Sequence, residues 1–391
     1  MHMRLRLCTL LLICATALLA GQTSGVTVIR FGKLWDGERV VAPAAVLVRD
    51  GRIEQVGAAI QAPAGANTID LRGFSAVPGL IDLHTHITYV WDPGPATVGS
   101  GRAVSQARRL PAVKVFMAQD NLRRTLETGV TTVRDLGASG DMDYALRELV
   151  ALGKATGPRL IVAGVGVSAG RGGPNPQAMR DAAEARIKAG SDWVKVYGSR
   201  GSFQSVDTTQ TVTFDEMKAI VDATHALGHK VAIHSYGAAG VKDAVRAGAD
   251  SVEHGIEIDD ETFAEMVKRG TVWVPTVDHN QYYVDAKDEY QWPPDAIPGL
   301  TGYIEKNLDA VRRAIKAGVT IGMGSDAVYT MFGRNTRELE WFVKAGMTPA
   351  QALATATTIP ARLLGIETKL GRIAPGYRSE EHTSELQSRF G

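Results

Sequence analysis

The sequence is almost free of cysteine, with only Cys8 and Cys14 among its 391 residues. Both lie in residues 1–25, which read as a signal peptide of the kind that is removed from exported proteins. The chain that remains after this removal has no thiol. This excludes disulfide bonds, thiolate metal ligands and a cysteine nucleophile, and it suits export to the periplasm or beyond.

The sequence also lacks an excess of charge of either sign. Lys and Arg number 43 against 42 Asp and Glu, which gives a formal net charge of +1 at pH 7. No basic block points to nucleic acid or anionic lipid, so the expected partner is a small molecule. A dinucleotide fingerprint is missing too, because Gly99-x-Gly101 and Gly164-x-Gly166 do not fit the strand, turn and helix that it requires.

The N-terminal segment has a basic start, an apolar stretch over residues 7–20 and a small polar end. The apolar stretch is too short to cross a bilayer comfortably. We therefore expect residues 1–25 to direct export, to the periplasm or the medium, with no membrane contact after their removal. Ala15-Thr16-Ala17 and the Ala20–Gly21 junction are both suitable cleavage sites.

The C-terminal residues 378–391 do not read as natural protein. Back-translation of residues 378–388 resembles, codon by codon, a common sequencing adapter, and the alternative is a charged, solvated tail. We interpret the segment as a sequence artefact and leave it out of the fold. The natural chain is then expected to continue after Tyr377.

Residues 26–78 contain short β segments separated by turns. Asp50-Gly51 between two alternating apolar runs is a strong hairpin signal. We expect the N-terminal part of a small split β-sandwich domain here, with residues 366–377 as its C-terminal remnant. The strand expected after Tyr377 is missing from the sequence, which would leave one sheet edge open.

Residues 79–365 alternate apolar strands with longer helical patterns, which is typical of βα units and a parallel sheet. Eight units favour an α/β fold of the (β/α)8 TIM barrel type, with a doubly wound open sheet as the alternative. The expected strands are residues 80–86, 130–136, 159–167, 193–197, 230–235, 250–254, 271–277 and 319–325. The expected helices are residues 114–128, 143–153, 177–189, 214–227, 238–247, 259–269, 304–317, 335–345 and 349–364.

Groups that can bind metal occur where these strands end, which is where barrels of this type place their chemistry. A His-x-His pair alone would be weak evidence, since the chain has 9 histidines. Five separate strands, however, carry such a group, and their agreement is far more specific than any single motif. The residues are His84 and His86, Lys195, His234, His254 and Asp326.

From Val26 to about Tyr377 the chain resembles the metal-dependent amidohydrolase superfamily, through the motifs GLIDLHTH, DWVKVYGS, AIHSYG, SVEHG and GSDA. Within this superfamily it looks like an exported branch near imidazolonepropionase and the Xaa-Pro or N-acyl-amino-acid dipeptidases, which includes ochratoxin-degrading enzymes. The resemblance implies two divalent metal ions, expected to be Zn²⁺. His84, His86 and Asp326 would hold one ion, and His234 and His254 the other. Lys195, carboxylated by CO2, would bridge both ions together with a hydroxide.

Physical chemistry agrees with a modified lysine, because an ammonium group among apolar strand residues is costly whereas a carbamate offers anionic oxygen to two dications. The resemblance implies that the hydroxide attacks an amide carbonyl while Asp326 acts as general base and then general acid. Tyr236, on the same face as His234, is expected to bind a substrate carboxylate or the oxyanion. The expected substrate is an N-acyl amino acid or dipeptide with a free carboxylate, a mycotoxin amide such as ochratoxin included.

Specificity is expected to come from the loops after the strands. Tyr89, Trp91 and His279 are candidate substrate contacts, and aromatic residues suggest a lid, although they could equally pack the loops onto the barrel. The loops also contain Arg102, Arg108 and Arg109 after strand one, residues 199–203 after strand four, and Tyr282, Tyr283, Tyr290 and Trp292 after strand seven.

Four further residues are interpreted as structural. His225 and His229 have the spacing of a helical zinc pair, but Gly228 ends the helix between them, so both are expected at the surface or as caps. Asp135 is expected to cap the chain or to pair with Arg134, and Asp82 to be a buried structural carboxylate.

Two other functional classes stay open on the sequence alone. A mononuclear deaminase or a cyclic-amide hydrolase like imidazolonepropionase would not need Lys195 as a bridge. An exported small-molecule-binding protein would keep the fold and the pocket without turnover. The sequence also leaves a homo-oligomer open.

Overall fold

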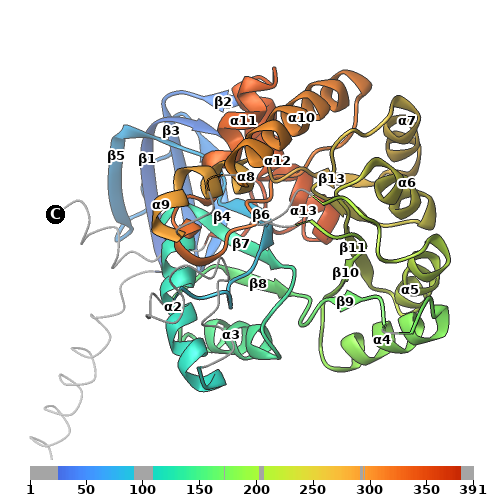
Figure 1. Ribbon diagram of the computed structural model, residues 1–391. Helices are drawn as coiled ribbons and strands as arrows, with labels where there is room; N and C mark the ends of the chain where they lie inside the picture. Colours follow the sequence, from blue (N-terminus) through green and yellow to red (C-terminus); the bar gives the residue numbers. More distant parts are fainter. Residues whose placement is uncertain are drawn as a thin grey trace, which may run out of the picture. The chain divides into compact units, whose positions relative to one another are not determined.

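The computed structural model describes residues 25–91, 109–170, 172–201, 207–290, 294 and 296–379. The segment interpreted as a signal peptide, apart from Gly25, and residues 380–391 lie outside the described residues. The chain forms two compact units (Figure 1). The first joins Met1–Pro78 to Thr368–Gly391, and the second is Gly79–Glu367.

The first unit is a five-stranded sheet in which β1 pairs antiparallel with β2 and β3 and parallel with β5. Asp50 and Gly51 both have positive φ and join β3 to β4 in the expected hairpin. The carbonyl of Tyr377 accepts a hydrogen bond from the amide of Ile53 at 2.9 Å, so the C-terminal segment lines the start of β4. The strands are β1 Val26–Trp35, β2 Val40–Val41, β3 Ala44–Arg49, β4 Arg52–Gly57 and β5 Asn67–Ala76.

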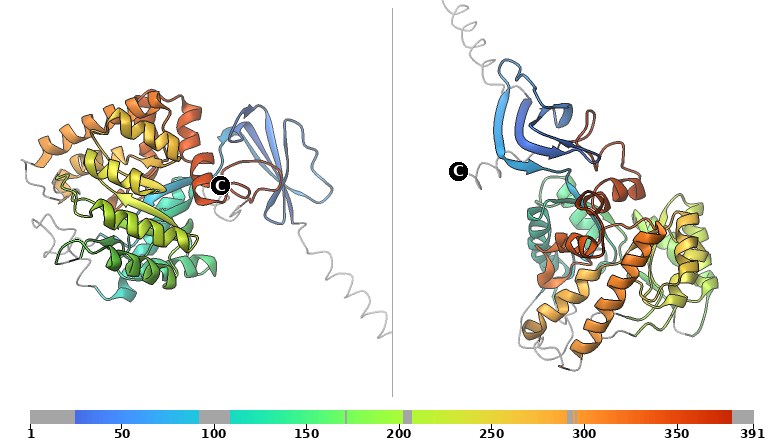
Figure 2. Two further views of the ribbon diagram at one scale, coloured as in Figure 1. Left: turned by 90° about the vertical axis from the view of Figure 1, so that its right-hand side faces the viewer. Right: turned by 90° about the horizontal axis from the view of Figure 1, so that it is seen from above.

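The second unit is a ring of parallel strands with helices on its outside (Figures 1 and 2). Its strands are β6 Leu80–Thr85, β7 Val130–Asp135, β8 Arg159–Val162, β9 Val167–Ser168, β10 Trp193–Tyr197, β11 Lys230–His234, β12 Ser251–Glu253 and β13 Val272–Val274. Its helices are α2 Pro111–Glu127, α3 Met142–Ala151, α4 Pro176–Lys188, α5 Phe214–Ala226, α6 Ala238–Ala247, α7 Asp260–Arg269, α8 Val277–Asp285, α9 Lys287–Tyr290, α10 Ala296–Ala317, α11 Glu338–Lys344, α12 Pro349–Thr355 and α13 Thr358–Leu364, with 3₁₀ turns η2 Tyr329–Met331 and η3 Asn335–Arg337.

The segment expected as the eighth strand, residues 319–325, closes the ring without forming a regular strand. One single bridge joins Ile321 in this segment to Trp273 on β13, and another joins Ala327, two residues after the segment, to Thr85 on β6. A side chain at Gly324 would collide with Val274 and His84, which explains why the sequence is glycine-rich where three segments crowd together. The predicted strand is wrong as a ladder, but the barrel is confirmed and the open doubly wound sheet is excluded.

The expected strand 159–167 is also divided in two. Gly164 has a φ of +64°, a backbone conformation that a strand cannot continue through. β8 therefore pairs with β7, and β9 pairs with β10. The segment thereby contributes β8 to the sheet of β6, β7 and β8, and β9 to the sheet of β9 to β13.

Side chains cap the N-termini of some of the helices, among them α4, α5, α7 and α12. Thr213 and Glu216 form a capping box at the start of α5, which contributes about 1 kcal/mol. Two expectations are wrong. The helix predicted over 349–364 is two helices, α12 and α13, because the chain leaves the helical conformation at Thr357. The loop after β13 contains α8 and α9, which the periodicity analysis missed.

Strand register places the lumen-facing residues of β10 to β13 in two layers. Tyr197, His234, Glu253 and Val274 lie at one level, and Lys195, Ala232, Ser251 and Val272 lie one step below. The alternate residues, such as Val194, Ile233 and Val252, pack in the core under the helices. Small residues in the lower layer leave room inside the barrel for long side chains.

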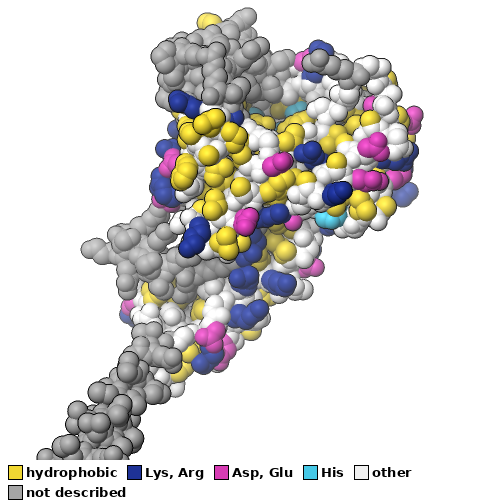
Figure 3. Space-filling model, turned by 90° about the horizontal axis from the view of Figure 1, so that it is seen from below, with side chains coloured by type: hydrophobic (Ala, Val, Ile, Leu, Met, Phe, Trp, Pro, Cys, Tyr) yellow, Lys and Arg dark blue, Asp and Glu magenta, His cyan; other side chains and the backbone are white. Residues whose placement is uncertain are grey.

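The surface carries charges of both signs. Figure 3 shows basic and acidic side chains interspersed on one face, with hydrophobic side chains gathered on part of it. At the start of α2 the large side chains of the N-cap residue Leu110 and of Val113 and Phe116 are exposed, spaced three residues apart. Over the part of the chain that the structure describes, no helix combines the length and the apolar character needed to cross a membrane.

Candidate metal centre

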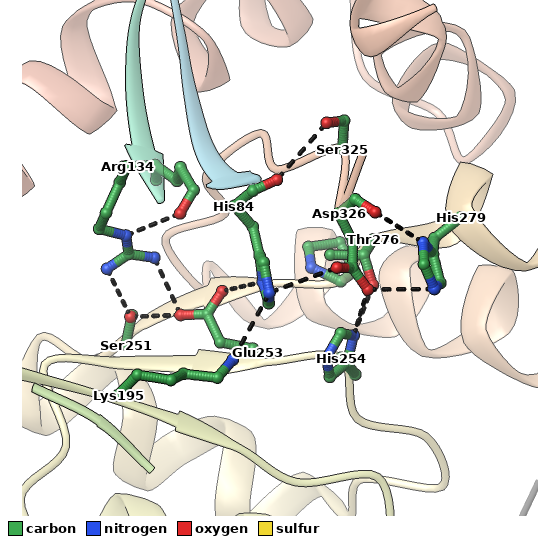
Figure 4. Close-up of polar contacts among 12 residues, drawn as sticks. His84, Arg134, Lys195, Ser251, Glu253, His254, Thr276, His279, Ser325 and Asp326 are labelled. Atoms are coloured by element: carbon green, nitrogen blue, oxygen red, sulfur yellow. Dashed lines mark hydrogen bonds and ion pairs between the residues drawn. The ribbon is translucent and has the colours of Figure 1, made fainter. Parts of the chain in front are cut away.

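His84, His86 and Asp326 converge at the end of β6. Their ligand atoms all lie within 4.8 Å of one another, and all three side chains are buried. The amide of Asp326 donates to the carbonyl of His84 at 2.7 Å, so the closing segment is held directly against the strand that carries the histidines. Ser325, which precedes Asp326, also contacts the carbonyl of His84, although the two residues are 241 positions apart in the sequence (Figure 4).

The proton positions on two imidazoles follow from their partners. Nδ1 of His86 lies 2.8 Å from the carbonyl oxygen of Gly137, and Nδ1 of His279 lies 2.8 Å from that of Asp326. A carbonyl only accepts, so both Nδ1 atoms carry the hydrogen. In the neutral rings both Nε2 atoms then present lone pairs.

Both of these lone pairs face the same carboxylate. Nε2 of His86 lies 3.1 Å from Oδ1 of Asp326, and Nε2 of His279 lies 3.2 Å from Oδ2. Acceptors that face acceptors at this distance require a positive charge between them, supplied by a proton or by a cation. Imidazole nitrogen and carboxylate oxygen are ligands that zinc prefers, so the donor set fits a divalent metal ion.

The electrostatics of the site favour neutral imidazoles around a charged carboxylate. Burial, together with the charge of Lys195, holds the pKa of His84 well below its usual range. Burial would raise the pKa of Asp326, but His279, His84 and His86 together hold it well below the usual range. Neutral histidine and ionised aspartate are the forms that bind metal.

Lys195 extends from β10 into the lumen, where it is 1% exposed. Its Nζ lies 3.5 Å from Nε2 of His84. Burial lowers the pKa of Lys195 to about 8, partly offset by the charges of Glu253 and Asp326. At pH 7 about a tenth of this amine is therefore unprotonated, far more than for a lysine with the usual pKa of 10.5.

His234 and His254 lie on the far side of the same cluster, with ring centroids 4.5 Å apart. Burial and the charge of Lys195 lower the pKa of His234 to about 3. Nδ1 of His254 and the Thr276 hydroxyl are 2.7 Å apart, and the same nitrogen lies 4.0 Å from Asp326. The structure thus brings all six predicted metal-binding residues to one end of the barrel.

Three residues that turn the chain out of the strands have left-handed backbones. His254, Thr276 and Asp326 have φ values of 64°, 50° and 51°. Such conformations are rare for residues other than glycine, and rarest for a β-branched one, and they concentrate at functional sites. The Trp273 indole donates to the carbonyl of His254 and helps to hold this turn.

A pocket of about 320 Å³ opens beside the cluster. Of the predicted substrate contacts, Tyr89, Tyr236 and His279 line it, whereas Trp91 packs against Tyr329 with centroids 6.3 Å apart. Among the described residues that line it there is no lysine or arginine. The full lining is His86, Tyr89, Tyr197, Ser199, Gly201, His234, Tyr236, His254, His279, Tyr283, Asp326, Val328 and Tyr329.

Tyr236 stacks on His254 with centroids 4.6 Å apart. Burial and the charge of Asp326 hold its pKa well above the usual range, so the phenol keeps its proton and can donate a hydrogen bond. Of the aromatic residues expected to form a lid, Tyr283 lines the pocket and Tyr282 packs into the core. Tyr290 lies at the end of α9.

Several other expectations have definite outcomes. Asp82 accepts hydrogen bonds from Ser325, Asn335 and the amide of His84, as expected of a structural carboxylate. His225 pairs with Asp250 and His229 lies near the carbonyl of Asp192, outside the site. Arg109 lies at the start of the described chain before α2. The residues Arg102, Arg108, Ser202, Phe203 and Trp292 lie outside the described residues.

The expected pairing of Asp135 with Arg134 is wrong, because neighbouring residues on a strand point to opposite faces. Asp135 accepts from the amide of Ile87 and the hydroxyl of Thr85, at 2.6 and 3.0 Å. Arg134 points into the lumen and pairs with Glu253 at 2.9 Å. Glu253 was not among the predicted site residues, although it precedes His254 in the motif SVEHG.

Comparison with known proteins gives a consistent result. Residues 75–379 match the sequence profile of the Amidohydrolase family. The chain is 30% identical to ochratoxinase from Aspergillus niger over 206 residues, 52% of this chain and 42% of that protein. It is 26% identical to imidazolonepropionase from Symbiobacterium thermophilum over 387 residues, 89% of this chain and 85% of that protein.

A solved structure shares the fold. The crystal structure of a Xaa-Pro dipeptidase with methionine bound in the active site superposes with a TM-score of 0.81 and 29% identity. The match covers 90% of this chain and 92% of that one. The similarity therefore extends over both units of the chain.

Proposed function

The chain belongs to the amidohydrolase family and is a hydrolase of C–N bonds, and from this premise we propose that it cleaves the amide bond between an acyl group and an amino acid with a free carboxylate. The observation that carries the proposal is the carboxylate of Asp326, faced at 3.1 and 3.2 Å by the lone pairs of two imidazoles. This arrangement calls for a positive charge between the two groups, and a divalent metal ion would supply it, because hydrolytic metal centres use this donor set.

The family is metal-dependent, and we propose two zinc ions. His84, His86 and Asp326 would hold one, and His234, His254 and a carboxylated Lys195 would complete the second. When bound, the metal pair supplies a hydroxide nucleophile near neutral pH and polarises the scissile carbonyl. His279 contacts the backbone carbonyl of Asp326 through Nδ1 and its carboxylate through Nε2, and it would hold that carboxylate in place when Nε2 also carries a proton.

Asp326 is the group that moves protons in this proposal. Its carboxylate is ionised in the buried site, so it can accept the proton of the attacking water. The same proton is then available for the leaving nitrogen of the amide. The phenol of Tyr236 stays protonated and can donate to the oxygen on which negative charge develops.

The pocket supports an acyl group with apolar or aromatic character. Five of its lining residues are tyrosines, which offer ring faces and hydroxyl donors. N-acyl amino acids, Xaa-Pro dipeptides and ochratoxin-type amides all combine such a group with an amide and a carboxylate. Ochratoxinase and a Xaa-Pro dipeptidase among the similar proteins support this choice of substrates.

A mononuclear cyclic-amide hydrolase is the second candidate. It is favoured by one observation: among the histidine and carboxylate side chains of the described residues, one group of three, made of His84, His86 and Asp326, converges closely enough to hold an ion. This candidate predicts turnover of a cyclic amide by an enzyme with a single metal ion.

The test is hydrolysis of a substrate panel by enzyme stripped with a chelator and then reloaded with Zn²⁺ in bicarbonate. The panel contains N-acyl amino acids, the matching esters of their carboxylates, Xaa-Pro dipeptides, ochratoxin A and imidazolone propionate. We expect metal-dependent release of an amino acid from acids but not from their esters. Turnover of the cyclic amide alone, or activity that survives metal removal, would contradict the proposal.

A further inference from the structure

A charged pair lies beneath the metal centre in the barrel lumen. Arg134 on β7 and Glu253 on β12 are both 0% exposed, and Nη2 of Arg134 lies 2.9 Å from Oε1 of Glu253. Desolvating two charges costs several kcal/mol per ion, and apolar residues of the same volume are often no less stable. Stability alone therefore gives no reason for this pair.

The two oxygens of Glu253 have different partners. Oε1 accepts from Arg134 and, at 2.5 Å, from the hydroxyl of Ser251. Oε2 lies 2.9 Å from Nδ1 of His84, across the lumen (Figure 4). The carboxylate thus connects a fixed cation to one imidazole of the proposed metal centre.

Arg134 is itself held on every side. Its Nε donates to the carbonyl of Leu83 at 2.7 Å, its Nη1 donates to Ser251 at 2.9 Å, and its guanidinium lies 4.4 Å from the ring of Trp193. Leu83 directly precedes His84. The same guanidinium therefore fixes both the backbone before His84 and the carboxylate that contacts its ring.

We propose that Glu253, oriented by Arg134 and Ser251, is a positioning residue that keeps the hydrogen of His84 on Nδ1 and aims its Nε2 at the metal. The inference rests on the proposed function of the site as a metal centre. A carboxylate partner on the outer nitrogen fixes the tautomer and the ring orientation of a histidine ligand and raises its basicity. Loss of such a partner lowers metal affinity about 10- to 100-fold.

The test compares Glu253→Gln with Glu216→Gln. The glutamine at 253 keeps the size of the side chain but offers one acceptor where two are needed. Glu216 is also buried, at 1% exposure, and accepts hydrogen bonds from Asn175 and Thr213 at the start of α5, away from the site. Both variants lose a buried carboxylate, but only one contacts a proposed ligand.

The main readout is the dissociation constant for Zn²⁺, from competition with a chromophoric chelator. We expect Glu253→Gln to weaken the tighter zinc site about 10- to 100-fold and Glu216→Gln to leave it unchanged. Side-chain ¹⁵N NMR of the zinc-loaded protein should show a protonated Nδ1 for His84 in the wild type and an altered signal in Glu253→Gln. Unchanged affinity and unchanged His84 signals in folded Glu253→Gln would overturn the inference.

Ser251→Ala keeps the test decisive if Glu253→Gln does not fold. It removes one donor to Oε1 but keeps the ion pair, and we expect a fall of a few-fold in zinc affinity. No change in this variant would also count against the inference. A wild-type protein that binds no zinc would instead contradict the proposed function, so the two failures are distinguishable.

Discussion

In one half of the metal centre, His84, His86 and Asp326 offer three ligand atoms that all lie within 4.8 Å of one another. In the other half, His234 and His254 offer two imidazoles, and the third proposed ligand is the amine of Lys195. A protonated amine repels a metal ion, and it becomes a ligand only after modification. In the proposed function, the fold alone prepares the first half, whereas the second half would need CO2 to complete it.

The two halves also differ in how they are built. The first half joins β6 to the closing segment through the hydrogen bond from Asp326 to His84. The second half comes from β10, from β11 and from the residue after β12. Lys195 on β10 is level with Ala232, two residues before His234 on β11. We therefore expect the first half to bind metal with or without dissolved CO2. Metal binding by the second half should depend on carboxylation of Lys195.

Asp326→Asn removes the carboxylate ligand of the first half and should have the largest effect on activity. The amide can neither accept a proton nor compensate the charge of a metal ion. We expect kcat to fall about 10⁴-fold, at the upper end of what general acid–base catalysis supplies. Steady-state kinetics on the best substrate of the panel measures this. Activity within tenfold of the wild type would show that Asp326 does not move the proton.

Lys195→Ala removes the third proposed ligand of the second half and leaves the ligands of the first half, His84, His86 and Asp326, in place. We expect one zinc ion per chain in place of two, and a fall in kcat of about 10³-fold, because one metal no longer contributes charge stabilisation. Added acetate or propionate should restore part of the activity by filling the space with a carboxylate.

Lys230→Ala is the matched control for this variant. Lys230 lies at the start of β11, where its amine donates to the carbonyl of Leu363 at 2.6 Å, outside the site. Zinc content and kcat should not change. Equal losses in the two variants would mean that Lys195 acts through stability and not as a ligand.

Tyr236→Phe should lower kcat less than the ligand variants do, and zinc binding at both sites should not change. Removal of one oxyanion donor costs about 10²-fold in kcat. Tyr303→Phe is the control, because Tyr303 lies against the ring of Tyr236, with centroids 5.2 Å apart, but is absent from the pocket lining. If both variants lose the same activity, Tyr236 contributes packing and not a hydrogen bond.

The smallest expected effect is a few-fold change in zinc occupancy with pH, which should affect the second site and not the first. Carboxylation consumes the neutral amine, and burial lowers the pKa of Lys195 to about 8. At constant dissolved CO2, occupancy of the second zinc site should therefore increase as the pH of reconstitution rises from 6 through 8, while occupancy of the first stays constant. A flat profile for both sites would argue against a carboxylated lysine.

The sequence contained enough information to place the site because its ligands lie at strand ends. Period-two alternation puts Lys195 and Tyr197 on one face, and parallel strands bring their ends to one rim. The eight segments and most helices follow from the same regular patterns. The position of a site residue at the end of a βα strand can therefore be predicted from its own strand.

Contacts across the barrel lumen were not predictable in this way. The pair of Arg134 and Glu253 joins β7 to β12, two strands that do not pair with each other, and no periodicity relates them. The left-handed backbone of Thr276 is equally invisible, because a β-branched residue is a poor choice for it. The irregular closing segment depends on how closely Gly324 approaches β6 and β13.

The central claim is that one metal site is prepared by the fold and the other is completed by CO2. The most direct test is the number of zinc ions bound per chain, measured by metal analysis after reconstitution of stripped wild-type enzyme with and without bicarbonate. We expect two ions per chain with bicarbonate and one in CO2-depleted buffer. One ion under both conditions, or two without CO2, would contradict it.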